Sequence, residues 1–436
     1  MLALAATMMA SALFAAPSTV GPVGQTGEPA LVEQADLVEG AWLQFHGPAG
    51  ERLLRVDEGG RVTPIGLPPQ LRGEPLKISP LQDGWTVAVD RNTPAAREKS
   101  YCCREIEEPE PDDPNCCAEW VVGVHDPGGR WKTVQTLPHS RGTRTWVSEP
   151  VESHGQIEIA WGEQFSETVW VAEAPLGRPF GPPHRAGRVQ PEPTDAVNAY
   201  AEFGHLWIDG EYGPHLSEAR PSYIIERRLF GNGRLGPPRL LRSPLLEERG
   251  TFFDGPGGSE LYVYVLGANR VVVARRAPGA SSFEHPRVVL RHGNAEMQST
   301  QSLDDRTLLS METEPSRPGT ERILAVGISP GGRPGPARTV ESEPDPSTRY
   351  WEGAIDDAGK WLIASSPWNG GPLWLHPYSP LCAYLQRKIP LGASTTGSGD
   401  PKPRVTAGPA GAFHVAWIDR QDQVQTTTVR VSCGVE

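Results

Sequence analysis

The stretch His154-Gly-Gln-Ile-Glu-Ile-Ala-Trp161 decides the fold, because variants of it recur along the chain. In each copy a turn that contains glycine precedes a short run of alternating apolar residues, and most copies include an aromatic residue. Alternation with a period of two is typical of a β-strand in a packed sheet. The further copies are Phe203–Asp209, Gly258–Val265, Ala358–Ala364 and Gly411–Asp419.

A second glycine-rich turn follows each copy after another strand-like run. Its copies are Asp57–Val62, Asp126–Trp131, Pro175–Pro182, Gly231–Pro237, Pro278–Phe283 and Pro330–Pro336. A further apolar run follows most of them, so the unit holds about four short strands. The equivalent aromatic residues Trp161 and Trp207 lie 46 positions apart. A repeat of roughly 50 residues with four short strands indicates the blades of a β-propeller.

Eight such units can be placed along the chain, of which the first and last are the least complete. They lie near residues 36–70, 76–138, 145–190, 195–243, 249–291, 296–341, 349–391 and 402–433. The last unit shows two clear strands, and we expect an N-terminal strand to complete it. The predicted fold class is therefore all-β, a β-propeller of seven or eight four-stranded blades, with seven if the first and last units share a sheet. A row of β-sandwich domains is the alternative, but a unit of about 50 residues is too small for a sandwich.

Composition agrees with a soluble repeat protein. The chain contains 48 Gly and 45 Pro, yet also 13 Trp, 9 Tyr and 10 Phe, whereas disordered chains are poor in aromatic residues. The formal net charge of −12 argues against a nucleic-acid partner, because phosphate binding requires a basic surface. We expect a monomer.

The N-terminus resembles an export signal. Residues 1–17 form an apolar run that ends in small residues, as in a bacterial signal peptide, although no Lys or Arg precedes Arg52. This run is too short to span a membrane, and no other segment is long and apolar enough to do so. The predicted organisation is a signal peptide over 1–17, a Pro/Gly-rich segment over 18–35 and a single propeller domain over 36–436. The expected location is secreted or periplasmic.

Six cysteines in an exported chain suggest disulfide bonds. The candidates are Cys102, Cys103, Cys116, Cys117, Cys382 and Cys433. The first four bound an acidic hairpin insertion at 100–118, and the last two would tie the C-terminal strand to the preceding unit. A zinc site is the rival interpretation of the first four, but adjacent cysteine pairs fit the usual C-x2-C spacing poorly. Calcium binding by the acidic stretch Glu105–Asp113 is a further alternative, although its two prolines match no known loop.

The second turn resembles the Asp box, S-x-D-x-G-x-x-W, of sialidase-type (BNR-repeat) β-propellers. The best copy, Val124-His-Asp126-Pro-Gly128-Gly-Arg-Trp131, has the Asp, Gly and Trp. Asp57 and Gly59 keep two of the three, while Asp357-Ala-Gly359-Lys-Trp361 is one residue short and falls in another turn. The resemblance implies a folding device in which Asp accepts backbone hydrogen bonds, Gly takes positive φ and the aromatic residue packs between blades. The sequence has no Arg-Ile-Pro signature near its N-terminus, and the resemblance assigns no catalytic residue.

Two functions are consistent with this pattern. The first is a binding or structural module that presents propeller loops to a glycan or a protein. The second is a divergent sialidase-like glycoside hydrolase or lyase, which would need two carboxylates about 5–10 Å apart on the axial loops. The sequence favours the non-catalytic function and predicts no cofactor and no metal. Trp161, Trp207 and Trp417 are expected in the core, whereas Trp368 and Trp374, in turn-rich surroundings, are the candidate binding residues.

Overall fold

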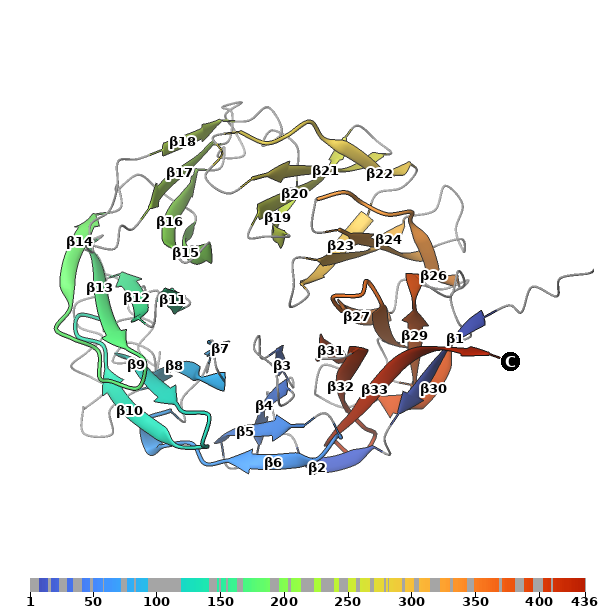
Figure 1. The fold of residues 1–436 in the computed structure, drawn as a ribbon, viewed down its shortest axis with the longest axis horizontal. Coiled ribbons are helices and arrows are strands. Elements are labelled where there is room, and N and C mark those ends of the chain that lie inside the picture. The colour runs from blue at the N-terminus through green and yellow to red at the C-terminus, as the bar shows by residue number, and fades with distance from the viewer. Residues whose placement is uncertain are drawn as a thin grey trace, which may run out of the picture. The chain divides into compact units, whose positions relative to one another are not determined.

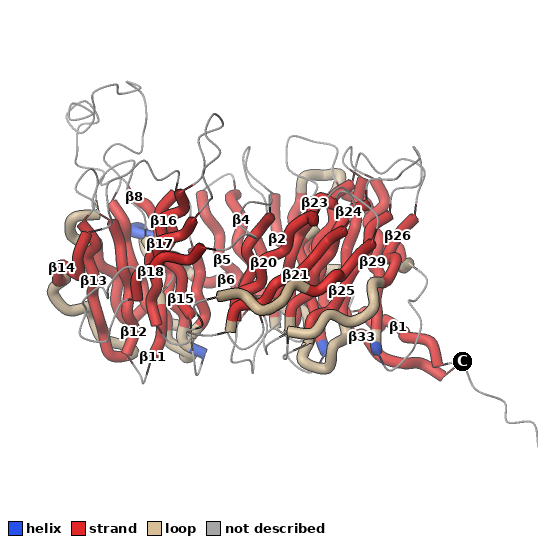
Figure 2. The backbone as a smooth tube through the Cα atoms, turned by 90° about the horizontal axis from the view of Figure 1, so that it is seen from above, coloured by secondary structure: helices blue, strands red, loops and turns tan. Residues whose placement is uncertain are grey.

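The computed structural model describes residues 8–435 with the exception of short segments between or beside the strands. The segments outside the described residues are 15–16, 23–29, 34–40, 48–49, 58, 72–76, 82–83, 93–118, 141–146, 149, 154–155, 163–167, 189–195, 203–204, 213–222, 229–238, 243–249, 256–258, 267–269, 278–279, 281, 292–294, 302–305, 314–321, 330–331, 343–348, 368–370, 381–387, 395–402 and 409–410. The described chain is all-β, and its regular structure is almost entirely strand (Figure 2).

The strands of the described residues form seven four-stranded antiparallel sheets and one five-stranded sheet (Figure 1). Nearly every strand pairs with the next one along the chain, because a short turn can join only antiparallel neighbours. Each unit expected from the sequence repeat coincides, to within a few residues, with one of these sheets. The all-β class and the division into small antiparallel sheets are therefore confirmed. The chain separates into two compact units, residues 1–65 with 248–436 and residues 66–247.

The first compact unit contains five sheets. Four of them are β3(Ala30–Glu33)–β4(Ala41–Gly47)–β5(Gly50–Val56)–β6(Val62–Ile65), β19(Gly250–Gly255)–β20(Ser259–Leu266)–β21(Arg270–Arg276)–β22(Arg287–Arg291), β23(Ala295–Gln301)–β24(Thr307–Thr313)–β25(Arg322–Ile328)–β26(Arg338–Ser342) and β27(Arg349–Ile355)–β28(Trp361–Pro367)–β29(Gly371–Tyr378)–β30(Ile389–Ser394). The fifth contains β31(Arg404–Ala407), β32(Ala412–Ile418) and β33(Gln423–Val435), with β1(Met8–Phe14) and β2(Ser18–Pro22) added to β33.

Consecutive sheets of this unit pack face to face. Their first strands contact in chain order, β19 with β23, β23 with β27, β27 with β31 and β31 with β3. At one of these contacts Glu352 of β27 accepts hydrogen bonds from the Arg404 side chain, at 2.9 Å, and from the backbone N–H of Val405, at 3.1 Å. Strands such as β28 and β32 are buried along almost their whole length, because a sheet lies against each face. This explains why apolar residues run consecutively in the middle of the repeat.

The N-terminal strands complete the last sheet, as expected. Strand β1 pairs with the end of β33, where Met8 lies opposite Val435 and Phe14 opposite Val429. Strand β2 pairs with the beginning of β33, where Ser18 lies opposite Thr426. Strand β1 falls within the expected signal peptide, and β2 begins directly after it. Removal of residues 1–17 would therefore remove β1 and keep β2.

The second compact unit contains three sheets and the short 3-10 helix η1(Pro69–Leu71). The sheets are β7(Lys77–Pro80)–β8(Thr86–Asn92)–β9(Glu119–His125)–β10(Trp131–Thr136), β11(Val151–Ser153)–β12(Gln156–Gly162)–β13(Thr168–Pro175)–β14(His184–Arg188) and β15(Ala196–Glu202)–β16(His205–Tyr212)–β17(Tyr223–Arg228)–β18(Arg239–Arg242). A core of Trp120, Trp161 and aliphatic side chains joins the first two of these sheets. Trp161 and Trp417 are buried, as predicted.

Candidate functional site

A five-residue turn recurs between strands of both units. The backbone N–H of its first residue donates to the carbonyl of the fifth, and the N–H of the fourth donates to the carbonyl of the first. The fourth residue has positive φ, as in a hairpin that closes with a left-handed residue. The described copies are 57–61, 126–130, 329–333, 356–360 and 419–423.

The side chain of the first residue closes this turn. The Oδ1 atoms of Asp126, Asp356 and Asp419 accept the backbone N–H of the fifth residue at 2.7, 2.8 and 3.0 Å. The expected role of the aspartate, as an acceptor of backbone hydrogen bonds within the turn, is thereby confirmed. In the copy at 329–333 the first residue is a serine, whose Oγ lies 3.2 Å from the backbone nitrogen of Arg333.

The structure corrects three details of how the copies of this turn were compared in the sequence. The glycine with positive φ is Gly129, not Gly128, because the left-handed position is the fourth of the turn. In the copy before Trp361 the capping residue is Asp356 rather than Asp357, which restores the spacing found between Asp126 and Trp131. The glycine-rich turn expected at Pro330–Pro336 begins one residue earlier, at Ser329, and the copy that begins at Asp419 was missed because it lacks the glycine.

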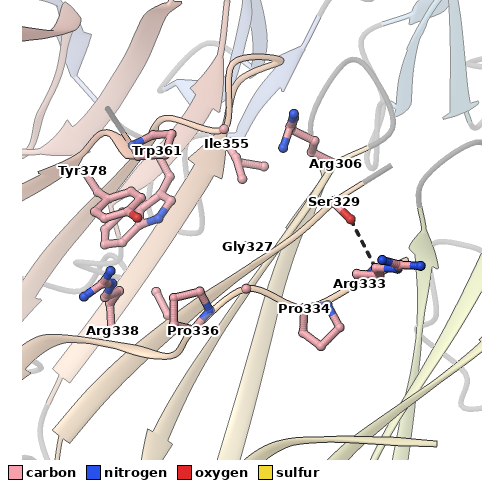
Figure 3. Close-up of a pocket in the computed structure, with 14 residues that line it drawn as sticks. Arg306, Gly327, Ser329, Arg333, Pro334, Pro336, Arg338, Ile355, Trp361 and Tyr378 are labelled. Atoms are coloured by element: carbon pink, nitrogen blue, oxygen red, sulfur yellow. Dashed lines mark hydrogen bonds between the residues drawn. The ribbon is translucent and has the colours of Figure 1, made fainter. Parts of the chain in front are cut away.

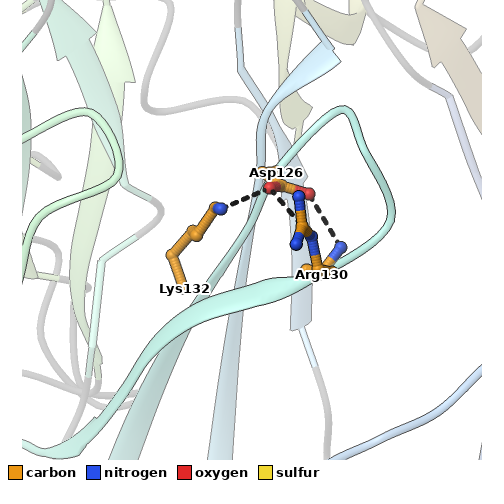
Figure 4. A network of polar contacts seen from close by, with 3 residues as sticks. All are labelled: Asp126, Arg130 and Lys132. Atoms are coloured by element: carbon orange, nitrogen blue, oxygen red, sulfur yellow. Dashed lines mark hydrogen bonds and ion pairs between the residues drawn. The ribbon is translucent and has the colours of Figure 1, made fainter.

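Asp126 illustrates how the second carboxylate oxygen is used in such a turn (Figure 4). Its Oδ2 lies 2.8 Å from Lys132 Nζ and 4.0 Å from Arg130 Nε. The hydrogen bond from Lys132 and the bond from the Arg130 backbone hold the pKa of Asp126 below its ordinary value. Both carboxylate oxygens of Asp126 are thus used to stabilise the turn.

A pocket of about 340 Å³ opens beside the serine copy of the turn, within the first compact unit (Figure 3). This volume is at the lower end of the range for small-molecule sites. The turns β25–β26 and β27–β28, Arg306 just before β24, and residues of β25 to β29 contribute its walls. The lining residues are Arg306, Ala325, Gly327, Ser329, Arg333, Pro334, Gly335, Pro336, Arg338, Ile355, Gly359, Trp361, Tyr378 and Pro380.

One wall of the pocket is aromatic. Trp361 and Tyr378 lie directly opposite each other on β28 and β29, and their rings stack with centroids 4.7 Å apart and planes 17° apart. The guanidinium carbon of Arg338 lies 5.9 Å from the centroid of the Tyr378 ring, at the same end of the pocket. Trp361 is only 2% exposed, so Tyr378 presents the apolar surface of this pair, with a cation beside it.

The pocket is also cationic. Arg306 and Arg333 lie at the end opposite the aromatic pair (Figure 3). The Nε of Arg306 donates to the backbone carbonyl of Asp357 at 2.8 Å, which fixes the side chain in place. Among the described residues neither Arg333 nor Arg338 forms an ion pair, and the described lining contains no carboxylate. A site with three guanidinium groups and no acid is suited to an anion.

Of the candidate residues from the sequence, only Trp374 has a described side chain, and it is not among the residues that line this pocket. Trp374 lies in β29, half-buried, with Lys388 Nζ 4.6 Å from its ring centroid. Trp368 lies outside the described residues, as do Cys102, Cys103, Cys116, Cys117 and Cys382 together with the acidic hairpin. Cys433 occupies a position in β33, but its side chain is not described. The disulfide candidates therefore remain predictions.

Two other pairs of polar side chains have residue types that occur in catalytic sites. The Oγ of Ser365 lies 2.9 Å from Nε2 of His376, but both residues are at most 2% exposed, so no substrate reaches them. Glu158 and Glu173 lie opposite each other in the middle of β12 and β13, in the second compact unit. Within the described part of the chain no cluster of His, Cys, Asp or Glu could hold a metal ion. None of the helical structure described there has the length and apolarity of a membrane-crossing helix.

The sequence matches no protein-family model and no curated protein sequence. Solved structures of similar shape include prolyl oligopeptidase B from Galerina marginata, with 11% identity over 93% of this chain and 56% of that chain and a TM-score of 0.49. A prolyl endopeptidase has 13% identity over 92% of this chain and 54% of that chain, with a TM-score of 0.45. A PL25 ulvan lyase has 9% identity over 95% of both chains, with a TM-score of 0.38. The chain spans about half the length of the two peptidases. Membership of the sialidase family is not among these findings.

Proposed function

We propose that this chain is an eight-bladed β-propeller that acts as a binding module. The face-to-face packing of consecutive sheets in the first compact unit, through their first strands in chain order, supports this arrangement. The addition of the N-terminal strand β2 to the last sheet also supports it, because closed propellers join their ends in this way. We further propose that residues 1–17 are removed on export and that the protein works in the periplasm or outside the cell.

The ligand that the pocket suits best is an acidic sugar unit, one that carries a carboxylate or a sulfate. A single observation carries this proposal: three arginines and a stacked aromatic pair line one pocket whose described lining holds no acid. Guanidinium groups bind carboxylate and sulfate oxygens with charge-assisted hydrogen bonds. Tyr378 supplies the apolar surface against which the ring carbons of a sugar can pack, and the buried Trp361 stacks behind it.

A flat protein surface fits this site less well. A stable protein interface buries about 800 Å² on each partner, far more than the walls of a pocket of this size provide. An acidic side chain of a protein partner could still enter the pocket, so the experiment below includes an acidic peptide.

A second candidate function, sugar cleavage, is favoured by the pair of glutamates in the second compact unit. Burial, and to a lesser extent the neighbouring Glu173, raise the pKa of Glu158 to about 7, as in many catalytic acids. The pair lies in the middle of the second and third strands of its sheet, however, rather than at the end of a first strand where an axial site would lie. Two observations would be required to adopt this function. The unchanged chain must cleave an acidic polysaccharide, and Glu158→Gln must lose that activity.

Calorimetric titration of the full chain tests the binding proposal. The ligands are a uronic acid disaccharide, a sulfated disaccharide, neutral cellobiose and an acidic peptide. We expect at least one acidic sugar to bind and cellobiose not to bind. Arg333→Ala and Arg338→Ala should each weaken binding about tenfold or more, the usual effect of losing a hydrogen bond to a charged group.

Arg61→Ala is the matched control. Arg61 is the exposed fifth residue of the turn at 57–61, just as Arg333 is the exposed fifth residue of the turn at 329–333. It should leave binding unchanged. Failure of every acidic sugar to bind would overturn the proposal, as would equal losses in Arg61→Ala and Arg333→Ala. Binding of the acidic peptide alone would replace the sugar with a protein partner.

A further inference from the structure

The pocket lies beside the one described copy of the five-residue turn that does not begin with an acid. The other four copies begin with Asp57, Asp126, Asp356 and Asp419, and the copy at the pocket begins with Ser329. Ser329 is also the member of this set whose side chain belongs to the pocket lining. The exchange of aspartate for serine therefore removes a negative charge at the end of the pocket where Arg306 and Arg333 lie.

The aspartate copies show where a carboxylate at position 329 would act. Their Oδ1 closes the turn, and the second oxygen is directed to a neighbouring donor: Asp126 Oδ2 lies 2.8 Å from Lys132 Nζ, and Asp419 Oδ2 lies 2.6 Å from Gln425 Nε2. In the turn at 126–130 that same oxygen also lies 4.0 Å from Nε of Arg130, the fifth residue. Arg333 is the fifth residue of the turn at the pocket, so an aspartate at 329 would bring an acid to its guanidinium.

The serine closes the turn with a longer hydrogen bond than the aspartates do. Its Oγ accepts the N–H of the fifth residue at 3.2 Å, whereas the aspartates accept it at 2.7 to 3.0 Å. A hydrogen bond to a charged acceptor is also stronger than one to a hydroxyl. The turn would therefore be at least as stable with aspartate, and its stability does not account for the serine.

We propose that Ser329 determines the specificity of this pocket for anions, by keeping the first position of the turn neutral and leaving Arg333 available to the ligand. This inference rests on the proposed function, since it names the residue that makes the same pocket selective. Ser329 need not touch the ligand. Most copies of the turn begin with an acid. Ser329 ensures that the copy at the pocket brings no carboxylate to the site.

The test compares Ser329→Asp with Ser329→Asn in the full chain. The two side chains have nearly the same size, and both can close the turn, so they differ in charge alone. Binding of the acidic disaccharide found in the experiment above is measured by calorimetry, and folding is measured by thermal unfolding. We expect Ser329→Asn to bind within about twofold of the unchanged chain. Ser329→Asp should lose about tenfold or more in affinity with no loss of melting temperature.

Two outcomes would overturn the inference while leaving the proposed function intact. In the first, the unchanged chain binds an acidic sugar and Ser329→Asp binds it with the same affinity. The second is an equal loss in Ser329→Asn and Ser329→Asp, which would show that the hydroxyl and not the charge matters. If the unchanged chain binds no acidic sugar, the proposed function itself fails, and the inference fails with it.

Discussion

Glu158 and Glu173 lie directly opposite each other on β12 and β13, so two carboxyl groups share one face of an antiparallel pair. Glu158 is half-buried, and its Oε1 has no hydrogen-bond partner among the described residues. Burial is the main cause that raises the pKa of Glu158 to about 7, from an ordinary value of 4.5, and the charge of Glu173 adds to it.

This relationship predicts that Glu158→Gln stabilises the protein at high pH. The folded state holds the Glu158 proton more tightly than the unfolded state does, so stability falls as the pH rises from 4.5 to about 7 and stays reduced above it. The glutamine variant lacks this loss. Because the carboxylate is partly exposed, we expect a gain of about 1 kcal/mol at pH 8 and none at pH 4.5. Chemical denaturation at the two pH values measures it, and an equal gain at both would contradict the explanation.

His414 is predicted to act in the opposite direction. It is fully buried in β32, where its Nδ1 lies 3.0 Å from Thr428 Oγ1. Burial lowers its pKa to about 4 from 6.5, with Arg430 adding to this effect and Asp57 opposing it. The unfolded state therefore binds the proton first, and stability falls as the pH drops from 6.5 to 4, by about 2 to 3 kcal/mol.

The two effects overlap between pH 4.5 and 6.5, so the His414 effect is best measured in the Glu158→Gln background. Nuclear magnetic resonance of the ring provides an independent check. The ring should stay neutral at pH 5.5 in the folded protein, and a ring that titrates near pH 6.5 would show that it is exposed. A loss of stability with acid that persists in the variant Glu158→Gln/His414→Asn would point to other groups.

The small sheets could be predicted because the evidence for them is local. Alternating apolar residues and glycine turns repeat along the chain, and the unit expected near 145–190 is found as β11 to β14. The alternation fades in central strands such as β28, which are buried on both faces, yet the glycine turns still mark their ends.

The pocket could not be predicted because it depends on pairing. Trp361 and Tyr378 meet only because β28 and β29 pair in the observed register, and their separation in sequence carries no sign of it. Ser329 lines the same pocket, and it is the first residue of a turn that has serine where the other described copies have aspartate. One sequence signal was available: Asp356 and Trp361 have the same spacing as Asp126 and Trp131, and it was obscured because Asp357 was aligned in place of Asp356.

The left-handed glycines of the turns predict a matched pair of substitutions. Gly332 has φ of 67° and Gly129 has φ of 84°, so alanine is strained at both. A Cβ at Gly129 meets nothing within 4 Å, whereas a Cβ at Gly332 would overlap Cδ of Arg275. The Arg275 side chain is held by Glu284, with Nη1 2.8 Å from Oε1.

We therefore expect Gly129→Ala to cost about 1 kcal/mol and Gly332→Ala about 2 to 4 kcal/mol. Denaturation curves measure both. In a chain that already carries Arg275→Ala, the Cβ of Gly332→Ala no longer meets the Arg275 side chain. There, Gly332→Ala should lower the free energy of unfolding only about as much as Gly129→Ala does in the unchanged chain. If the two glycine variants lose the same amount, the Arg275 side chain moves aside freely and the close approach has no energetic consequence.

The pairing of β2 with β33 predicts how much of the N-terminus the fold requires. Thr19 Oγ1 and the Gln425 amide lie 3.0 to 3.1 Å apart, and Gln425 Nε2 donates in turn to Asp419 Oδ2 at 2.6 Å. Val20 packs against the core of the first sheet beside it.

A chain that begins at Ser18 keeps all these contacts, whereas a chain that begins at 24 loses them and leaves the first half of β33 as an open edge, which promotes aggregation. We expect the first to melt several degrees above the second and to stay monodisperse in light scattering. Thr19→Val, which removes one hydroxyl, should cost only about 1 kcal/mol. Equal melting temperatures for the two shortened chains would show that β2 adds nothing to the last sheet.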